Sequence, residues 1–284
     1  MRKLVPACSS RPARYDAATG SAGLAPAGLL QRIFCGWNRR PRRAGGEFPM
    51  AIIAFANPKG GAGKTTSALV LGTELAARTK VAVIDADPNH PITDWAALPG
   101  KPDNLTVLGD IGEHNIVETI DAAAETHAFV LVDLEGTAST VVAYAIGRAD
   151  LVLIPLQAKQ LDGKQAVRAI QLVKRQEKAF RRRIPHSVLL TRTSAAIRSR
   201  ALRAIVEDLE AAGVKILPVE LIERGAFDAF LAYGGTLEAL DRKEVAGVDK
   251  AIENARAYAA AVIQLLRENE AEAQAAAVAG GQGA

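Results

Sequence analysis

A glycine-rich segment with two lysines has the spacing that most clearly points to chemistry in this sequence. An apolar run at residues 51–56 leads into the segment, which reads Lys59-Gly60-Gly61-Ala62-Gly63-Lys64-Thr65-Thr66. Glycines let backbone N–H groups approach an anion closely, and the start of a following helix attracts negative charge. Lys64 is placed to reach the β- and γ-phosphates of a nucleotide, and the Thr65 hydroxyl is placed to ligate Mg²⁺.

The segment departs from the general phosphate-loop pattern G-x-x-x-x-G-K-[ST]. Pro58 stands where that pattern has its first glycine, and Lys59 stands at the front of the loop. The alternative is a glycine-rich turn without a ligand. The position of the segment between an apolar run and a helical pattern favours the phosphate loop.

Three aspartates follow two further apolar runs. Asp85 and Asp87 lie in an Asp-Ala-Asp-Pro sequence after residues 80–84, and Asp133 follows residues 129–132. Because ligands of open α/β sheets bind at the carboxyl ends of parallel strands, we expect these carboxylates at the phosphate loop. Asp133 would hold Mg²⁺ through a bound water, since Mg²⁺ keeps several waters. The alternatives are a proline-terminated turn with two solvated acids, and a buried strand that simply ends in aspartate.

Together these motifs resemble the ParA/MinD ATPases. Residues 59–66 match their deviant Walker A motif, K-G-G-x-G-K-[ST]-[ST]. The resemblance implies ATP and Mg²⁺ as cofactors and catalytic roles for Lys59, Lys64 and Asp87. It also implies an ATP-dependent homodimer in which Lys59 reaches the partner's nucleotide. Asp87 would orient the attacking water, and Asp85 would support the metal shell with Thr65 and Asp133.

The residues after Asp133 resemble the VirC-type branch of this family, found in conjugative DNA transfer. Most ParA proteins have a small residue and two prolines there, whereas this chain has Leu-Glu-Gly-Thr-Ala-Ser at residues 134–139. Further matches occur at residues 148–152, 187–193 and 234–237, so the resemblance covers nearly all of residues 50–240. Many relatives carry an adenine-contacting asparagine where Thr191 stands. Threonine has no amide to read a base, so we expect backbone groups near Pro218 to contribute.

Alternating patterns of strand and helix indicate the elements that position these residues. They predict one α/β domain at residues 50–270: a doubly wound, mostly parallel sheet with helices on both faces, as in P-loop NTPases. Strands are expected at 51–56, 80–84, 105–108, 129–132, 150–155, 187–191 and 214–219. Helices are expected at 65–78, 116–125, 141–147, 163–180, 199–211 and 250–270. The Ala/Gly-rich residues 271–284 are expected to form a flexible tail.

The charge and the cysteines separate residues 1–49 from the rest. These residues hold nine Arg/Lys and two acids, a net charge of +7, whereas the remainder carries −3. Both cysteines, Cys8 and Cys35, also lie there, so the remainder has neither a disulfide nor a cysteine-ligated cluster. We expect a non-native or disordered leader, with a transit peptide as the alternative.

Two basic groups could bind DNA phosphates. One surrounds the end of the predicted helix at 163–180, and the other comprises Arg192, Arg198, Arg200 and Arg203. In ParA-like proteins such surfaces bind duplex DNA without sequence preference, which gives the expected nucleic-acid contact. The alternative is a solvated helix face.

The sequence favours a cytoplasmic, nucleoid-associated ATPase of plasmid partition or conjugative DNA transfer. A ParB-like or relaxosome protein is the expected partner. A MinD-like membrane switch or a protein-cargo positioning ATPase is the alternative. The closing segment contains Glu268, Glu270 and Glu272 rather than a basic face, so we expect no membrane binding. A metabolic P-loop enzyme would not need Lys59.

Overall fold

The computed structural model describes residues 50–281 except 137, 158–162 and 195–199. The leader expected at residues 1–49 and the candidate DNA contact Arg198 therefore lie outside the described residues. Seven parallel strands form a single sheet in the order β3-β2-β4-β1-β5-β6-β7. The strands are Ala51–Phe55 (β1), Val81–Ala86 (β2), Leu105–Leu108 (β3), Phe129–Leu134 (β4), Leu151–Gln157 (β5), His186–Thr193 (β6) and Leu221–Ile222 (β7).

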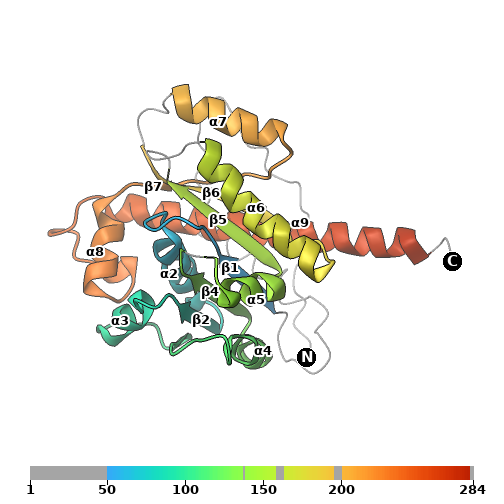
Figure 1. The fold of residues 1–284 in the computed structure, drawn as a ribbon. Coiled ribbons are helices and arrows are strands. Elements are labelled where there is room, and N and C mark those ends of the chain that lie inside the picture. The colour runs from blue at the N-terminus through green and yellow to red at the C-terminus, as the bar shows by residue number, and fades with distance from the viewer. Residues whose placement is uncertain (1–49, 137, 158–162, 195–199, 282–284) are drawn as a thin grey trace, which may run out of the picture.

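Helices cover both faces of this sheet, as the alternation of elements predicts (Figure 1). One face packs against α2 (Lys64–Ala76), α3 (Pro91–Ala97), α8 (Gly225–Tyr233) and α9 (Val248–Gly281). The other packs against α4 (Ile116–Thr126), α5 (Thr140–Arg148), α6 (Gly163–Phe180) and α7 (Arg200–Ala211). A short 3₁₀ helix at Leu237–Ala239 precedes α9. The strands are buried on both sides, which explains why they read as continuous apolar runs.

The central strand β1 lies between β4 and β5. The chain leaves β1 toward one edge of the sheet through α2 and later crosses to the other edge between β4 and β5. This reversal creates the crevice in which open α/β sheets bind ligands. Asp85 and Asp133 are register partners on neighbouring β2 and β4, so the expectation that these strand ends meet is confirmed.

The structure corrects the predicted elements at the C-terminal side. Residues 214–219 make an isolated bridge between Ile216 and Val188 instead of a strand. Pro218 follows at once and has no N–H to continue a ladder, and the strand β7 begins only at Leu221. The helices α3 and α8 were not predicted.

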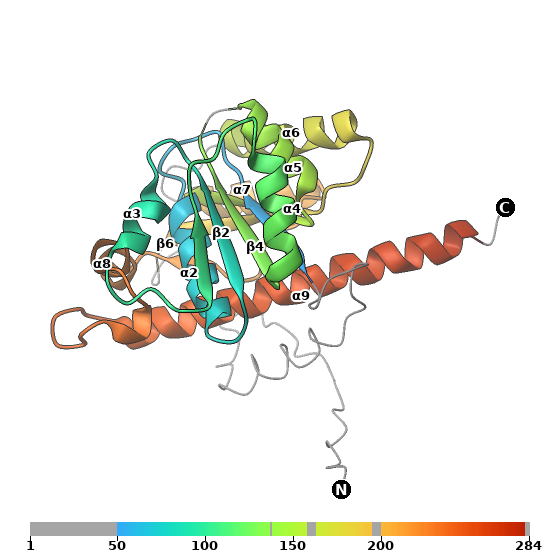
Figure 2. The same cartoon turned by 90° about the horizontal axis from the view of Figure 1, so that it is seen from below.

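The closing helix does not end at Glu270, because α9 continues through Gly281. Its last turns are rich in alanine, glutamate and glutamine, which are good helix formers. Residues 271–278 are exposed, and this end of α9 projects beyond the body of the molecule (Figure 2). None of the helices in the described ranges combines the length and the apolar character needed to cross a membrane.

Candidate functional site

The glycine-rich loop turns sharply into α2 and forms one wall of a cleft of about 420 Å³. Gly61 and Gly63 have φ angles of 72° and 91°, a left-handed conformation that glycine adopts without a Cβ penalty. The residues around the cleft come from the loop and from the ends of β2, β4 and β6. They are Gly60, Gly61, Ala62, Gly63, Lys64, Thr65, Thr66, Asp87, Pro88, Asn89, Glu135, Gly136 and Arg192.

Lys64 lies within this wall, at the first residue of α2, with only 6% of its surface exposed. Burial lowers the pKa of its ammonium group, and the carboxylates of Asp133, Asp87 and Glu135 oppose that shift. A cation held among acids at the start of a helix is well placed for phosphate oxygens, because both the charge and the helix N-terminus attract an anion.

Thr65 and Asp133 make a direct contact beside Lys64. The Thr65 hydroxyl donates a hydrogen bond of 2.7 Å to Oδ2 of Asp133. Asp133 is fully buried, and desolvation raises its pKa to about 7, with the Thr65 hydrogen bond and Lys64 opposing the shift. Its Oδ1 is buried without a hydrogen-bond partner, which is a costly state unless a cation or its water is bound there.

These oxygens fit Mg²⁺, which proteins bind with one or two carboxylates plus substrate phosphates. Thr65 and Asp133 would hold the ion, and Oδ1 of Asp85 is a second buried oxygen without a partner. No group of three or more His, Cys, Asp or Glu side chains in the described ranges could hold a metal by itself. A magnesium ion here would take its remaining ligands from nucleotide phosphates and water.

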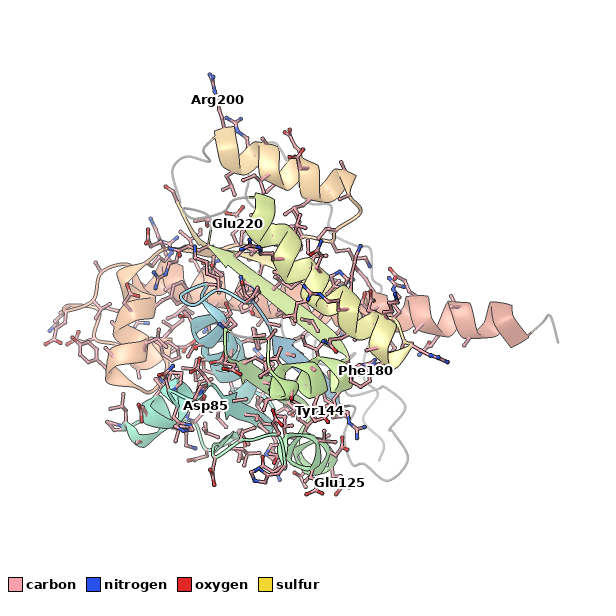
Figure 3. The ribbon with its side chains drawn as sticks, viewed as in Figure 1. Asp85, Glu125, Tyr144, Phe180, Arg200 and Glu220 are labelled. Carbon is pink, nitrogen blue, oxygen red and sulfur yellow. The ribbon has the colours of Figure 1, made fainter. Side chains whose placement is uncertain are left out.

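Asp85 also has a structural role that the sequence did not indicate. Its Oδ2 accepts hydrogen bonds from the backbone N–H groups of Ile92 and Thr93, at 3.0 and 2.8 Å, and from the Thr93 hydroxyl at 2.9 Å. These bonds tie the end of β2 to the first turn of α3. Figure 3 labels Asp85 in its place in the fold. Only Oδ1 remains for the metal-supporting role that the family resemblance implies.

Asp87 is less buried and borders the cleft directly. Its Oδ1 accepts two hydrogen bonds from Asn89, from the backbone N–H at 2.9 Å and from the side-chain amide at 2.8 Å. This Asx-type turn fixes the carboxylate over the loop. The placement is compatible with a carboxylate that orients a water.

Lys59 differs from Lys64 in its surroundings. Its backbone N–H donates to the side chain of Asn57 at 2.9 Å, and Asn57 is in turn anchored to the Pro155 carbonyl at 2.6 Å. The Lys59 side chain is half-exposed and is not among the groups bordering the cleft of its own subunit. The structure thus separates the two lysines into one that faces the cleft and one that does not.

Thr191 braces the loop. Its buried hydroxyl donates to the Ala62 carbonyl at 2.8 Å, and a Cβ on Gly63 would lie 3.3 Å from the Thr191 side chain. A second cavity of about 110 Å³ adjoins this point. It is bordered by Leu221–Arg224 rather than by Pro218, together with Gly63, Thr66, Ser67, Thr191, Arg192, Phe227 and Asp228. The expectation that backbone groups near Pro218 contact a base stays a prediction.

The candidate DNA residues separate into two places. Arg192 lines both cavities. Arg200 and Arg203 are exposed in the first turn of α7, and Arg200 points away from the body of the molecule (Figure 3).

The sequence motifs missed several groups at the cleft. Asn89, Glu135 and Gly136 border it, and each lies within three residues of a predicted site aspartate. A Cβ at Gly136 would lie 3.3 Å from the Gly60 nitrogen, so this glycine lets the segment after β4 lie against the loop. Proximity to Asp87 and Asp133 in the sequence was the signal available for all three.

Comparison with known proteins agrees with this geometry. Residues 50–268 match the family described as VirC1 protein. Protein ParA of Rhizobium radiobacter is 43% identical over 220 residues, which span 77% of this chain and 99% of that protein. Protein virC1 of Rhizobium radiobacter is 31% identical over 191 residues, or 65% of this chain and 82% of that protein.

A solved structure shares the fold. Apo McdA of Cyanothece superimposes with a TM-score of 0.60 at 20% identity, over 74% of this chain and 99% of that one. The resemblance inferred from the motifs at residues 59–66, 85–88 and 129–139 is confirmed by the family match over the same residues. The chain therefore belongs to the VirC1 family of ParA-like P-loop ATPases.

Proposed function

We propose that this protein is an ATP-driven switch that binds DNA as a dimer and acts in plasmid or DNA partition or in conjugative DNA transfer. The observation that carries the proposal is the cleft itself. Its glycine-rich loop, the buried Lys64 and the Thr65–Asp133 pair are arranged for a magnesium-bound nucleoside triphosphate. Relatives named ParA and virC1 support the cellular role.

In this proposal the nucleotide favours a dimer because it binds that state more tightly than the monomer. Two subunits close face to face, and Lys59 of each contacts the nucleotide of the other. Lys59 is half-exposed and outside the cleft of its own subunit, which suits a role in trans. Asp87 then orients the water for a slow hydrolysis that separates the subunits, and a ParB-like or relaxosome protein would stimulate this step.

The DNA contact is proposed at the start of α7. Arg200 and Arg203 lie in the first turn, where the helix dipole disfavours cations. Helix stability therefore does not explain two arginines at this end. Phosphate binding does, because it would occupy both charges and needs no base reading. Binding to chromosomal DNA would place the protein on the nucleoid in the cytoplasm.

Duplex binding measured at several salt concentrations tests this proposal. We expect binding of unrelated duplexes with ATP and Mg²⁺ and little binding without them. Arg200→Ala or Arg203→Ala should each flatten the log–log salt slope by roughly 2, since a dimer loses one contact per subunit at about 0.9 each. Lys250→Ala, at an exposed position on α9, is the control that should leave the slope unchanged.

The second candidate is an ATPase that positions a protein cargo without acting on DNA. One relative, 27% identical over 177 residues, is the maintenance of carboxysome distribution protein A of Halothiobacillus neapolitanus. Nucleotide-dependent dimerisation without any duplex binding would favour this candidate over the first.

A further inference from the structure

Arg192 stands at a junction that the motifs did not indicate. It borders both the phosphate-side cleft and the smaller cavity beside it. Among the described residues around the larger cleft, Lys64 and Arg192 are the two cations, and they approach it from different elements. Lys64 begins α2, whereas Arg192 lies near the end of β6.

The backbone at Arg192 directs its side chain to this junction. Thr191 pairs with Leu221 and Thr193 pairs with Ile222, and the register between β6 and β7 shifts between these two threonines. Arg192 has a φ of 50°, in the left-handed region that arginine seldom adopts. Such irregularities re-aim side chains and concentrate at functional sites, where surrounding contacts hold them.

The neighbouring residue holds this conformation against the loop. Thr191 is bonded to the Ala62 carbonyl, so Arg192 begins one residue from a fixed contact with the glycine-rich segment. The guanidinium is therefore carried by a strand end that is hydrogen-bonded to the glycine-rich segment.

Arg192 differs from several other arginines of the described ranges in how its charge is used. Several other arginines are paired with acids, among them Arg148 with Asp121, Arg242 with Asp249 and Arg256 with Glu238. Over the ranges that the structure describes, Arg192 has no ion pair or hydrogen bond from its side chain. An unpaired guanidinium at an anion-binding cleft is available for phosphate oxygens, which its planar fork can contact with two parallel hydrogen bonds.

We propose that Arg192 is a second cation of the nucleotide site and contacts the polyphosphate of the nucleotide bound by its own subunit. It would complement Lys64 from the opposite wall, and it would act in cis where Lys59 acts in trans. This inference rests on the proposed nucleotide-binding function and replaces the DNA contact that the sequence suggested for Arg192.

Nucleotide titration of three variants tests the inference. Arg192→Asn removes the charge and suits the left-handed backbone, since asparagine tolerates positive φ. Arg192→Gln removes the charge and keeps a side chain of similar length. Arg192→Lys keeps the positive charge but lacks the planar guanidinium group. With Mg²⁺, both neutral variants should bind ATP about 10- to 100-fold more weakly than the parent, the range expected for a lost charge-assisted contact. The lysine variant should recover part of that loss.

Three controls separate a phosphate contact from a structural role. Adenosine, which has no phosphate, should bind the parent and the variants with equal affinity. The unfolding temperature without nucleotide should not fall in Arg192→Asn. Lys250→Asn, at an exposed position on α9, should bind ATP as the parent does.

The outcomes distinguish the two levels of the proposal. If the parent binds ATP and both neutral variants bind it equally well, the inference about Arg192 is wrong while the proposed function stands. Equal losses for ATP and adenosine, or lost duplex binding at saturating ATP with unchanged ATP affinity, would also overturn it. If the parent binds no ATP, the proposed function fails and this inference fails with it.

Discussion

The hydroxyl of Thr191 donates a 2.8 Å hydrogen bond to the backbone carbonyl of Ala62, across 129 residues of sequence. This bond joins the end of β6 to the loop after β1. Strand β5 separates β1 from β6 in the sheet, so the bond bridges over an intervening strand. The position at which the family resemblance led us to expect an asparagine thus carries a threonine that holds the glycine-rich loop.

Replacing Thr191 by valine should loosen the loop. The change keeps the shape of the side chain but leaves the buried Ala62 carbonyl without its donor, so the free energy of unfolding should fall by about 1 kcal/mol. ATP affinity should fall with it, and Thr191→Ser should restore both. Chemical denaturation and nucleotide titration measure the two effects.

Thr193→Val is the matched control, two residues further along the same strand. The Thr193 hydroxyl is also buried but has no hydrogen-bond partner, so its removal should be neutral or stabilising. Equal destabilisation by the two valine variants would show that the hydrogen bond to Ala62 does not contribute to the free energy of unfolding.

The two lysines of the loop should give different defects. Lys64→Ala removes the buried cation of the cleft and should abolish measurable ATP binding. Lys59→Ala should leave ATP binding by the monomer nearly unchanged and weaken ATP-dependent dimerisation. Size-exclusion chromatography with a non-hydrolysable ATP analogue measures the second effect. Dimerisation of Lys59→Ala at the parent's level would contradict a role in trans.

Asp87→Ala should trap the ATP-bound dimer. The change removes the carboxylate that we expect to orient water but leaves Lys64 and Thr65 in place, so hydrolysis should slow by about 100-fold or more while ATP affinity holds or rises. Phosphate release in single-turnover conditions measures the rate. Asn89→Ala should slow hydrolysis less than Asp87→Ala does, because it removes the hydrogen bond from the side-chain amide to Asp87 and keeps the carboxylate. If Asp87→Ala hydrolyses ATP at the parent's rate, Asp87 does not orient the water. Asp85 would then be the next candidate for that role.

Glu74 should make the protein less stable as the pH rises toward neutrality. Burial raises its pKa from 4.5 to about 7, with Glu238 adding to the shift and Arg256, at 3.9 Å, opposing it. The folded state therefore holds this proton more tightly than the unfolded state. The proton's contribution to stability is fully present below pH 4.5 and is lost as the pH rises to about 7.

Glu74→Gln should flatten this decline. Because one pKa unit corresponds to about 1.4 kcal/mol, the variant should gain about 1 to 3 kcal/mol over the parent at pH 8 relative to pH 4.5. Denaturant unfolding across this pH range measures the difference. Glu253→Gln, at an exposed position on α9, should follow the parent. A Glu74→Gln curve parallel to the parent's would show that folding does not raise the pKa of Glu74.

Much of this arrangement could be predicted because the residues that could bind a nucleotide directly follow apolar runs that read as strands. The loop at residues 59–66 follows a buried strand, and the strand-end rule correctly brought Asp85 beside Asp133. The helix α3 has only seven residues, too few for an amphipathic period to stand out. The helix α8 is apolar almost throughout, with Asp228 as its one charged residue, so it shows no alternation of polar and apolar faces. One oxygen of Asp85 accepts hydrogen bonds from the start of α3, while the other is buried without a partner. No pattern in the sequence encodes this difference.

The position of Arg192 could not be predicted from the sequence. In the sequence it belongs to a run of arginines, and charge clustering grouped it with Arg200 and Arg203. In the structure Arg192 borders the two cavities, whereas Arg200 and Arg203 are exposed on α7. The backbone at Arg192 has a register shift and a left-handed φ. Both depend on how β7 pairs with β6, a tertiary contact that composition and spacing do not contain.

The position of β1 in the middle of the sheet has a consequence for how the chain acquires its active form. β1 pairs with β4 from Ala51↔Phe129 onward and with β5 from Ile53↔Leu151 onward. A ribosome must therefore synthesise about a hundred further residues before the strand that carries the phosphate loop has both neighbours. Contacts so distant in sequence slow folding and leave apolar segments uncovered in the meantime. A nascent chain cut short before β5 would leave β1 without one of its two neighbouring strands, so we expect nucleotide binding to begin late in the synthesis of this protein.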